Sequence, residues 1–288
     1  MPFAAAMSQH PLATHAVGEV VGEVLDQLGD QPDAAVVFVT GPFAGAMEDI
    51  AAAIRAMLRP GSLVGASAAS VLAGDREVEG SAAVSLFAMR FGPPRQFADE
   101  PLARVVRLDD HRALDPGLDG TLVLLADPFS FPVGAFIEGV AATAPALTVV
   151  GGLASSATGP GGNRLVADGR TFSDGAVGLL LPPGVGGTPV VSQGCRPVGE
   201  PFVVTRSTGN LIEEIAGQPA LDRLLAQAAS ATAEDRSRMA RGLQLGLVID
   251  ERKADFERDD FLARAVLGAD HVRRAVAVDA EVEVGSTI

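Results

Sequence analysis

Three kinds of residue in this 288-residue chain could carry chemistry: a serine in a glycine turn, one cysteine beside an arginine, and two Pro-Phe turns. Ser67 stands in Gly65-Ala66-Ser67-Ala68-Ala69, which resembles the nucleophile elbow of hydrolases with alanine in place of the last glycine. Such a serine also needs a histidine and an acid, and the histidines of this chain lie in tail or turn contexts. Hydrolysis at Ser67 is therefore an alternative and not the leading hypothesis.

The single cysteine, Cys195, precedes Arg196, a cation that would favour the reactive thiolate. A thiol enzyme is thus a second catalytic alternative, although a buried and inert cysteine is the commoner outcome. One cysteine excludes an intrachain disulfide, and the four histidines lack the spacing of metal ligands. We expect no cofactor and no metal site.

Pro42-Phe43 and Pro128-Phe129 each follow an apolar run of strand length and open a predicted helix. Turns of this kind lie at the carboxyl edge of a sheet, where α/β proteins bind ligands, and a helix N-terminus offers free N–H groups to an anion. The alternative is purely structural, because proline is favoured in the first helical turn and phenylalanine packs well into a core.

The two turns belong to a longer repetition, since residues 33–70 recur at 119–156 without a gap, with nine identical positions. In each copy the second strand ends in glycine, at Gly65 and at Gly151-Gly152, with Ser67 or Ser155 close by. Glycine lets a ligand approach the backbone and serine hydroxyls would bind its polar groups, although glycines that only pack under a helix are equally expected. We predict two copies of a β-α-β-β unit, about 33–90 and 119–181.

Apolar periodicity predicts the elements of these copies. Fully apolar strands indicate sheets covered on both faces, and a short link to the third strand of each copy favours antiparallel pairing there. The predicted fold class is α/β, with mixed β-sheets sandwiched with helices. The expected strands are 34–40, 62–66, 81–89, 122–126, 147–151 and 176–181, and the expected helices run from Thr14 to Gly29, over 47–58 and over 133–140.

A Pro- and Gly-rich stretch, 182–187, predicts a linker. The expected organisation is a tail at 1–13, a first domain at 14–183 and a second at 188–288. The last predicted strand has no later helix to cover it, which leaves an exposed edge. In the second domain we expect strands at 190–195, 202–206, 243–249, 261–266, 274–278 and 281–284, and helices beginning at Pro219 and Thr232.

The formal charge of −14, with a single lysine, opposes the phosphate neutralisation on which nucleic-acid binding depends. No apolar run reaches the roughly 18 residues that span a bilayer, and the N-terminus lacks the basic region of a signal peptide. These features predict a soluble, cytoplasmic protein that binds neither nucleic acid nor membrane.

Several segments together resemble the FIST proteins, and the resemblance runs from about residue 33 to the C-terminus. It implies an N-terminal and a C-terminal module, an intracellular sensory role for small ligands such as amino acids, and no established catalytic residue. Family members continue past residue 288 to a Cys-Asn-Gly-Arg-Gly segment, so the chain resembles a C-terminally short member. The segments are 64–67, 149–152, Gln193-Gly194-Cys195-Arg196-Pro197, 201–205 with Gly209-Asn210, 217–221, 245–249 and 261–268.

We therefore expect a non-catalytic sensory domain that binds a small polar ligand, an amino acid or similar metabolite, for signal transduction through a protein partner. A scaffold that binds only proteins is a further alternative. The predicted ligand-binding residues are Pro42, Phe43, Gly65, Ser67, Pro128, Phe129, Gly151, Gly152, Ser155, Cys195 and Arg196.

Overall fold

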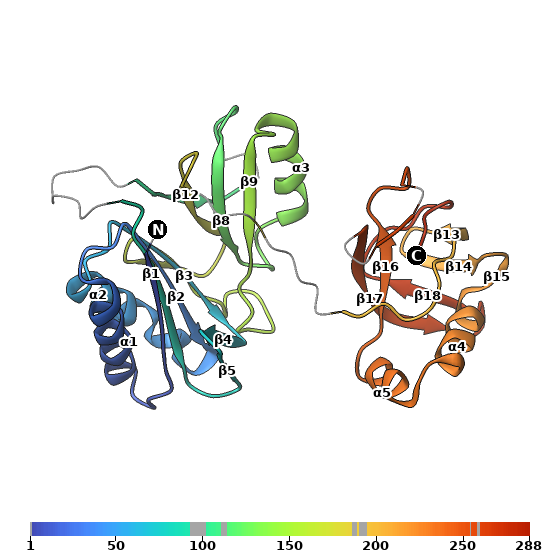
Figure 1. Ribbon diagram of the computed structural model, residues 1–288, viewed down its shortest axis with the longest axis horizontal. Helices are drawn as coiled ribbons and strands as arrows, with labels where there is room; N and C mark the ends of the chain where they lie inside the picture. Colours follow the sequence, from blue (N-terminus) through green and yellow to red (C-terminus); the bar gives the residue numbers. More distant parts are fainter. Residues whose placement is uncertain are drawn as a thin grey trace. The chain divides into compact units, whose positions relative to one another are not determined.

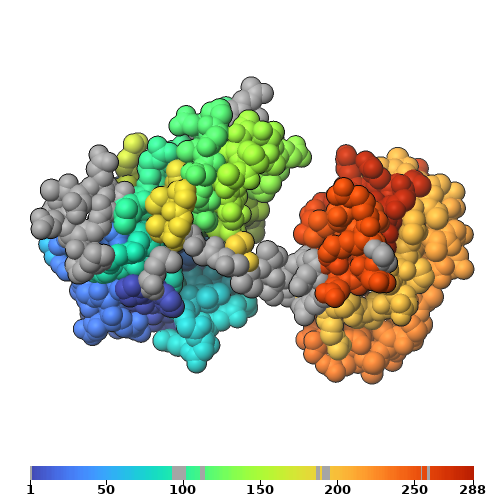
Figure 2. All heavy atoms as spheres, turned by 45° about the horizontal axis from the view of Figure 1, so that its top comes forward, coloured from blue at the N-terminus to red at the C-terminus, as the bar shows by residue number. Residues whose placement is uncertain are grey.

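The computed structural model describes residues 2–92, 102–110, 114–185, 189, 195–253, 255–257 and 260–288. The chain divides into two compact units, Met1–Pro189 and Val190–Ile288. Each unit has a hydrophobic core of its own. Figure 2 draws the heavy atoms of both units, coloured along the sequence. The predicted strand at 190–195 lies almost entirely outside the described residues.

The first sheet of the N-terminal unit has six strands in the order β1-β6-β2-β3-β10-β11. Strand β2 runs parallel to β3 and antiparallel to β6, so the sheet is mixed, as predicted. Helices α1 and α2 lie on the same side of this sheet (Figure 1). The elements are β1 (Phe3–Ser8), α1 (Ala13–Leu28), β2 (Ala34–Thr40), η1 (Gly41–Ala46), α2 (Met47–Met57), β3 (Ser62–Ala68), β6 (Val84–Met89), β10 (Leu165–Ala167) and β11 (Arg170–Phe172).

The second sheet has four strands in the order β7-β12-β8-β9, again with one parallel pair, β8 with β9. Helix α3 packs on its outer face. A short hairpin, β4-β5, forms a separate two-stranded sheet that packs against Met7 and Ala83 of the first half. The elements are β4 (Ser70–Ala73), β5 (Arg76–Glu79), β7 (Arg104–Leu108), β8 (Gly120–Ala126), α3 (Val133–Thr143), β9 (Leu147–Leu153) and β12 (Ala176–Leu181).

Alternation along β2 explains why the two sheets stack as the inner layers of a sandwich. Val37 and Val39 face α1 and α2, whereas Ala34 and Val36 face the second sheet, where they meet Leu179. Successive strand residues point to opposite faces, so a continuous apolar run fills both interfaces. The result is an α/β/β/α sandwich, and the predicted α/β class with mixed sheets and flanking helices is confirmed.

The predicted tail is wrong, because Phe3–Ser8 forms β1 and pairs antiparallel with β6 over its whole length. Its run of alanines shows neither helical nor strand periodicity, so the sequence pattern carried no signal. Small side chains at Ala4 and Ala6 are nevertheless fully buried under α1, and strand pairing supplies their backbone hydrogen bonds.

The two halves of this unit share an order of elements, but their registers differ by one residue. Ala34 pairs with Ser62 in the first half, whereas Gly120 pairs with Leu147 in the second, so the second connection is one residue shorter. A shift of one residue turns side chains to the opposite face of a sheet. The ungapped alignment of residues 33–70 with 119–156 is therefore wrong for the strands that follow the helices, β3 and β9, where one gap is needed. The duplication itself stays a prediction.

The C-terminal unit is an antiparallel sheet in the order β13-β14-β18-β17-β16, with α4 and α5 packed beside it. The helix predicted at Thr232 is confirmed, since the Thr232 hydroxyl accepts a hydrogen bond from the Asp235 amide at 3.1 Å. The elements are β13 (Val204–Thr208), β14 (Leu211–Ile215), β15 (Gln218–Pro219), α4 (Ala220–Ser230), α5 (Ala233–Arg241), β16 (Gln244–Val248), β17 (Phe261–Asp270) and β18 (Ala275–Val278).

The predicted strand at 281–284 is wrong, and the end of the described chain is not an exposed edge. The Phe202 and Ile288 backbones exchange two hydrogen bonds of 2.8 Å, and Val248 donates to the Thr287 carbonyl at 2.9 Å. The last residues thus lie between the start of β13 and the end of β16. These bonds satisfy backbone groups that an uncovered strand would leave unpaired.

Arg90, at the end of β6, holds the C-terminus of α1. Its guanidinium is 8% exposed and donates to the carbonyls of Leu28, Asp30 and Gln31 at 3.2, 2.7 and 3.3 Å. The last carbonyls of a helix have no partner within the helix, and a cation there also interacts favourably with the helix dipole.

Replacement of Arg90 by methionine should lower the free energy of unfolding by about 2–3 kcal/mol, because buried carbonyls lose a charged donor while the apolar stem is kept. The measurement is urea denaturation, read as a lower midpoint at unchanged slope. Arg104→Met, at the exposed start of β7, is the matched control and should stay near wild type. Equal effects of the two changes would contradict the capping role.

Candidate functional site

The two Pro-Phe turns of the first unit differ in structure. Phe43 lies in η1, is 6% exposed and packs into the core beneath α1 and α2. Pro128 and Phe129 lie in a turn, and α3 begins only at Val133. The prediction that Pro128-Phe129 opens a helix is wrong, because the carbonyl before this turn accepts the following amides and closes the turn first.

Two of the three glycines proposed for the site are needed for packing. A Cβ on Gly65 would lie 2.3 Å from the Val37 carbonyl oxygen, and one on Gly151 would lie 1.8 Å from the Leu124 carbonyl oxygen. Gly151 also has φ +145°, which L side chains rarely adopt. Gly152 differs, since no atom lies within 4 Å of its Cβ position. Only Gly152 leaves open space beside the backbone.

Ser67 is fully buried and its hydroxyl is already engaged. Its Oγ accepts hydrogen bonds from Ser156 Oγ at 2.7 Å and from the Arg164 amide at 2.8 Å. Ser155 lies nearby, where its amide donates to the Ser67 carbonyl at 3.1 Å and its Oγ accepts from the Ala69 amide at 3.0 Å. A serine nucleophile needs a base as its partner. The partners of Ser67 are a hydroxyl and a backbone amide, which is a structural arrangement.

Asn163 is the centre of this network and was not singled out from the sequence. It is 0% exposed, and its Nδ2 donates to Asp127 Oδ1 at 2.9 Å and to the Ala154 carbonyl at 3.3 Å. Its Oδ1 accepts from Ser156 Oγ at 3.1 Å and from the Ala157 amide at 3.0 Å. The network joins the ends of β3, β8 and β9, so these strand ends lie close together. The space between them is filled by hydrogen-bonded side chains and is not an open pocket.

A small cleft of about 270 Å³ adjoins this network, and Ser67, Gly151 and Gly152 line it together with apolar side chains such as Leu125 and Leu153. The volume lies just below the roughly 300 Å³ at which small-molecule sites begin. Pro42, Phe43, Gly65, Pro128, Phe129 and Ser155 are not among the residues that line it.

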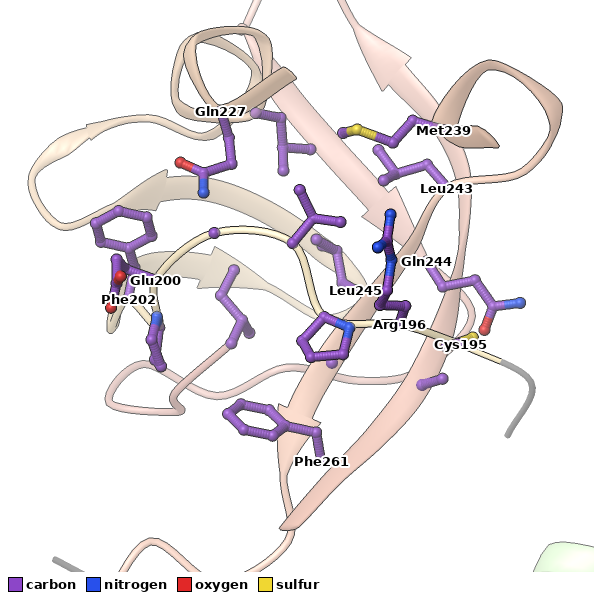
Figure 3. A pocket seen from close by; sticks show the side chains of 18 of the residues that line it. Cys195, Arg196, Glu200, Phe202, Gln227, Met239, Leu243, Gln244, Leu245 and Phe261 are labelled. Carbon is purple, nitrogen blue, oxygen red and sulfur yellow. The ribbon is translucent and has the colours of Figure 1, made fainter. Parts of the chain in front are cut away.

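A larger cavity, of about 920 Å³, lies within the C-terminal unit, and both predicted residues of that unit, Cys195 and Arg196, line it. Figure 3 shows Gln227 and Met239 on the helical side and Phe261 on the strand side. The volume falls within the range of small-molecule sites, about 300–1,000 Å³. Apolar side chains contribute much of the wall, including Phe202, Leu224, Met239, Leu243, Leu245 and Phe261.

One side of the cavity is the extended segment from Cys195 to Phe202, whose prolines lack the N–H that a central strand needs. Gly199 lets this segment lie against α4: its φ is +96°, and a Cβ there would lie 1.3 Å from Gln227 Nε2. A larger residue would push the segment away from the helix. The wall of the cavity therefore depends on a glycine at this position.

Three of the charged side chains that line the cavity, Arg196, Asp235 and Arg238, form ion pairs. Arg196 hydrogen-bonds to Asp235 and Arg238 to Glu234. A hydrogen bond from the Thr232 hydroxyl, together with the nearby Arg196 guanidinium, lowers the pKa of Asp235 below its ordinary value. Arg223 differs from these arginines, because its guanidinium lies over the Phe202 ring, with Cζ 4.6 Å from the ring centroid.

Sequence reasoning thus named residues from three different environments. Cys195 and Arg196 line the large cavity, Ser67, Gly151 and Gly152 line the small cleft, and the Pro-Phe turns line neither. Arg223, Gln227 and Asn163 were missed, since single polar residues in a helix or a glycine loop carry no motif. For Arg223 the sequence offered one signal, which is an arginine among the apolar residues of the helix predicted to begin at Pro219.

Two further findings concern metal sites and membrane-spanning helices. Within the residues that the structure describes, no group of three or more His, Cys, Asp or Glu side chains is placed to hold a metal ion. Among the described helices, none combines the length and the apolar character that crossing a bilayer requires.

The FIST N domain model matches residues 33–218, from just before β2 to the first residue of β15. The chain belongs to the FIST N domain family, a family associated with sensory and signal-transduction roles.

Curated relatives match over nearly the whole chain. The uncharacterized protein Rv0628c of Mycobacterium tuberculosis is 34% identical over 292 residues, which cover 100% of this chain and 76% of the relative. The uncharacterized protein Mb0898c of Mycobacterium bovis is 36% identical over 289 residues, covering 96% of this chain and 72% of the relative. The chain is similar to both over about three quarters of their length.

Gly65 and Gly152, which differ in their surroundings, provide a matched test of the strand packing beside the small cleft. Gly65→Ala should destabilise the protein by about 1–3 kcal/mol, because its Cβ would overlap the Val37 carbonyl. Gly152→Ala should cost far less, since its Cβ position is open. Urea denaturation of both variants measures the difference. Equal losses would show that the strand spacing described here is wrong.

Proposed function

We propose that the protein is a non-catalytic sensory domain and that the cavity of the C-terminal unit binds its ligand. One observation carries the proposal: a cavity of about 920 Å³ whose walls combine apolar side chains with several polar and charged ones. Small-molecule sites have this volume and this lining, with apolar surface for affinity and few polar groups for orientation. Membership of the FIST N domain family supports a sensory role.

The ligand belongs in this cavity and not at the predicted turns of the first unit. There the hydroxyl of Ser67 is already hydrogen-bonded, and the Phe43 ring is part of the core. A ligand at those positions would have to displace bonds that hold the sheets together. Cys195 and Arg196, in contrast, line open space.

Helix α5 is the element through which binding would produce a signal. It has no buried residue, and its polar sequence gives it little core packing of its own. Elements with few buried apolar contacts open at low free-energy cost. Met239 and Arg238 of α5 line the cavity, so a ligand in contact with them would favour the ordered helix. A partner protein would then bind to α5 in its ordered form.

A screen of amino acids and related metabolic acids by thermal shift tests the site. A ligand at 100 times its Kd should add about 2.7 kcal/mol to the free energy of unfolding. Leu243→Trp should abolish the shift because the indole would occupy the cavity, whereas Leu267→Trp, at a position 62% exposed on β17, should retain it. A shift that survives Leu243→Trp, or none from any compound, contradicts the proposal.

Hydrogen exchange tests the signalling step. With a ligand from the screen bound, amides of α5 should exchange several-fold more slowly, while those of β2 in the other unit should stay unchanged. Equal protection across the whole chain would indicate general stabilisation only, and no effect on α5 would remove this helix as the output element.

A further inference from the structure

We infer that the ligand of this cavity is a monocarboxylate with an apolar body and that Arg223 of α4 binds its carboxylate. The inference rests on the proposed function, because it names the chemistry of the ligand in the same cavity. The observation behind it is that the Arg223 guanidinium stacks on the Phe202 ring, whereas Arg196 and Arg238, the other arginines that line the cavity, form ion pairs.

Arg223 is held in a defined orientation before any ligand binds. Its side chain is half-buried, and the guanidinium lies 4.6 Å from the centroid of the Phe202 ring. Stacking on an aromatic face is favourable for arginine and fixes the plane of its hydrogen-bonding fork. A fork held in one plane matches the two oxygens of a carboxylate.

Two acidic side chains around α4, Asp222 and Asp235, are bonded to other arginines. The carboxylate of Asp222, the preceding residue, accepts a hydrogen bond from Arg274 Nε at 2.8 Å, and Asp235 is paired with Arg196. Across the described ranges, no carboxylate lies within ion-pair distance of Arg223, and its Nε is buried without a hydrogen-bond acceptor. A buried donor without an acceptor costs about 1–3 kcal/mol, and more when it is charged. An anionic ligand would supply the charge partner that Arg223 lacks within the described part of the chain.

The rest of the ligand must suit apolar walls. The Phe202 ring lies against the guanidinium, and Leu224, Met239, Leu245 and Phe261 line the same cavity. At about 920 Å³ the cavity is near the upper end for small-molecule sites, so a free polar amino acid would leave most of these walls in contact with water. Burial of apolar surface contributes roughly 25 cal/mol per Å², which favours a ligand with an aliphatic or aromatic body.

Two polar residues that line the cavity, Glu200 and Gln227, restrict the class of ligand further. Glu200 is an exposed carboxylate at the cavity, and it would repel a second acidic group on the ligand. The Gln227 amide points into the cavity in Figure 3, where it would hydrogen-bond a neutral polar substituent. These groups together favour a single carboxylate over a dicarboxylate.

Isothermal titration calorimetry with the full chain tests the inference, using 4-phenylbutyrate and octanoate, each paired with its neutral amide. The acids should bind at least ten-fold more tightly than the amides. Arg223→Gln should remove that difference, and Arg223→Lys should retain part of it, because a point charge lacks the planar fork. Arg252→Gln, at a side chain 91% exposed outside the cavity lining, should behave as wild type.

Each other outcome overturns the inference in a recognisable way. Equal binding of acids and amides would reject an anionic ligand while leaving a ligand cavity in place. Tight binding of the acids to a folded Arg223→Gln variant would reject Arg223 as the anchor, with circular dichroism and the urea midpoint confirming folding. Binding of phenylalanine in preference to 4-phenylbutyrate, lost in Glu200→Gln, would replace the class by an amino acid. If neither acid binds but another compound of the metabolite screen produces a thermal shift, the proposed ligand class is rejected and the proposed function stands.

Discussion

The carboxamide of Asn163 is buried where the strands of both inner sheets of the first unit end, and its hydrogen bonds join those ends. It donates to Asp127 and Ala154 and accepts from Ser156 and Ala157. In a dry interior, polar groups are tolerated only when their partners are present. Loss of this side chain would leave the buried Asp127 carboxylate with one fewer donor. The hydrogen bonds at the strand ends therefore converge on one amide, beside the apolar interface that stacks the two sheets.

This junction also decides what the first unit can do. Because Ser156 and the Arg164 amide both donate to Ser67, the serine that resembles a nucleophile acts as a structural acceptor. The close approach of β3 to β2 takes up the space at Gly65 in the same way. What remains open is a cleft of about 270 Å³. The polar groups at these strand ends are satisfied by one another, and for this reason we propose that the ligand binds in the other unit.

The second unit keeps a cavity because its covering segment cannot become a strand. Prolines at 197 and 201 lack the donor that sheet pairing requires, and Gly199 adopts a positive φ that lets the segment follow α4. At Phe202 the chain pairs with Ile288. Open space is thus preserved beside Arg223, a cation held on an aromatic ring and without a carboxylate partner in the described part of the chain.

The sequence by itself determined the long apolar elements: the strand at 34–40, the helix ended by Gly29 and the cap at Thr232 all stand as predicted, because their signals are local. Tertiary structure alone decided that an alanine-rich start pairs as β1, that β8 and β9 pair one residue out of step with β2 and β3, and that Asn163 is buried among partners while Arg223 stacks on Phe202. Local composition reports whether a segment can bury an apolar face. Which polar group finds a partner, and which is left without one, depends on residues distant in the chain that only the folded structure brings together.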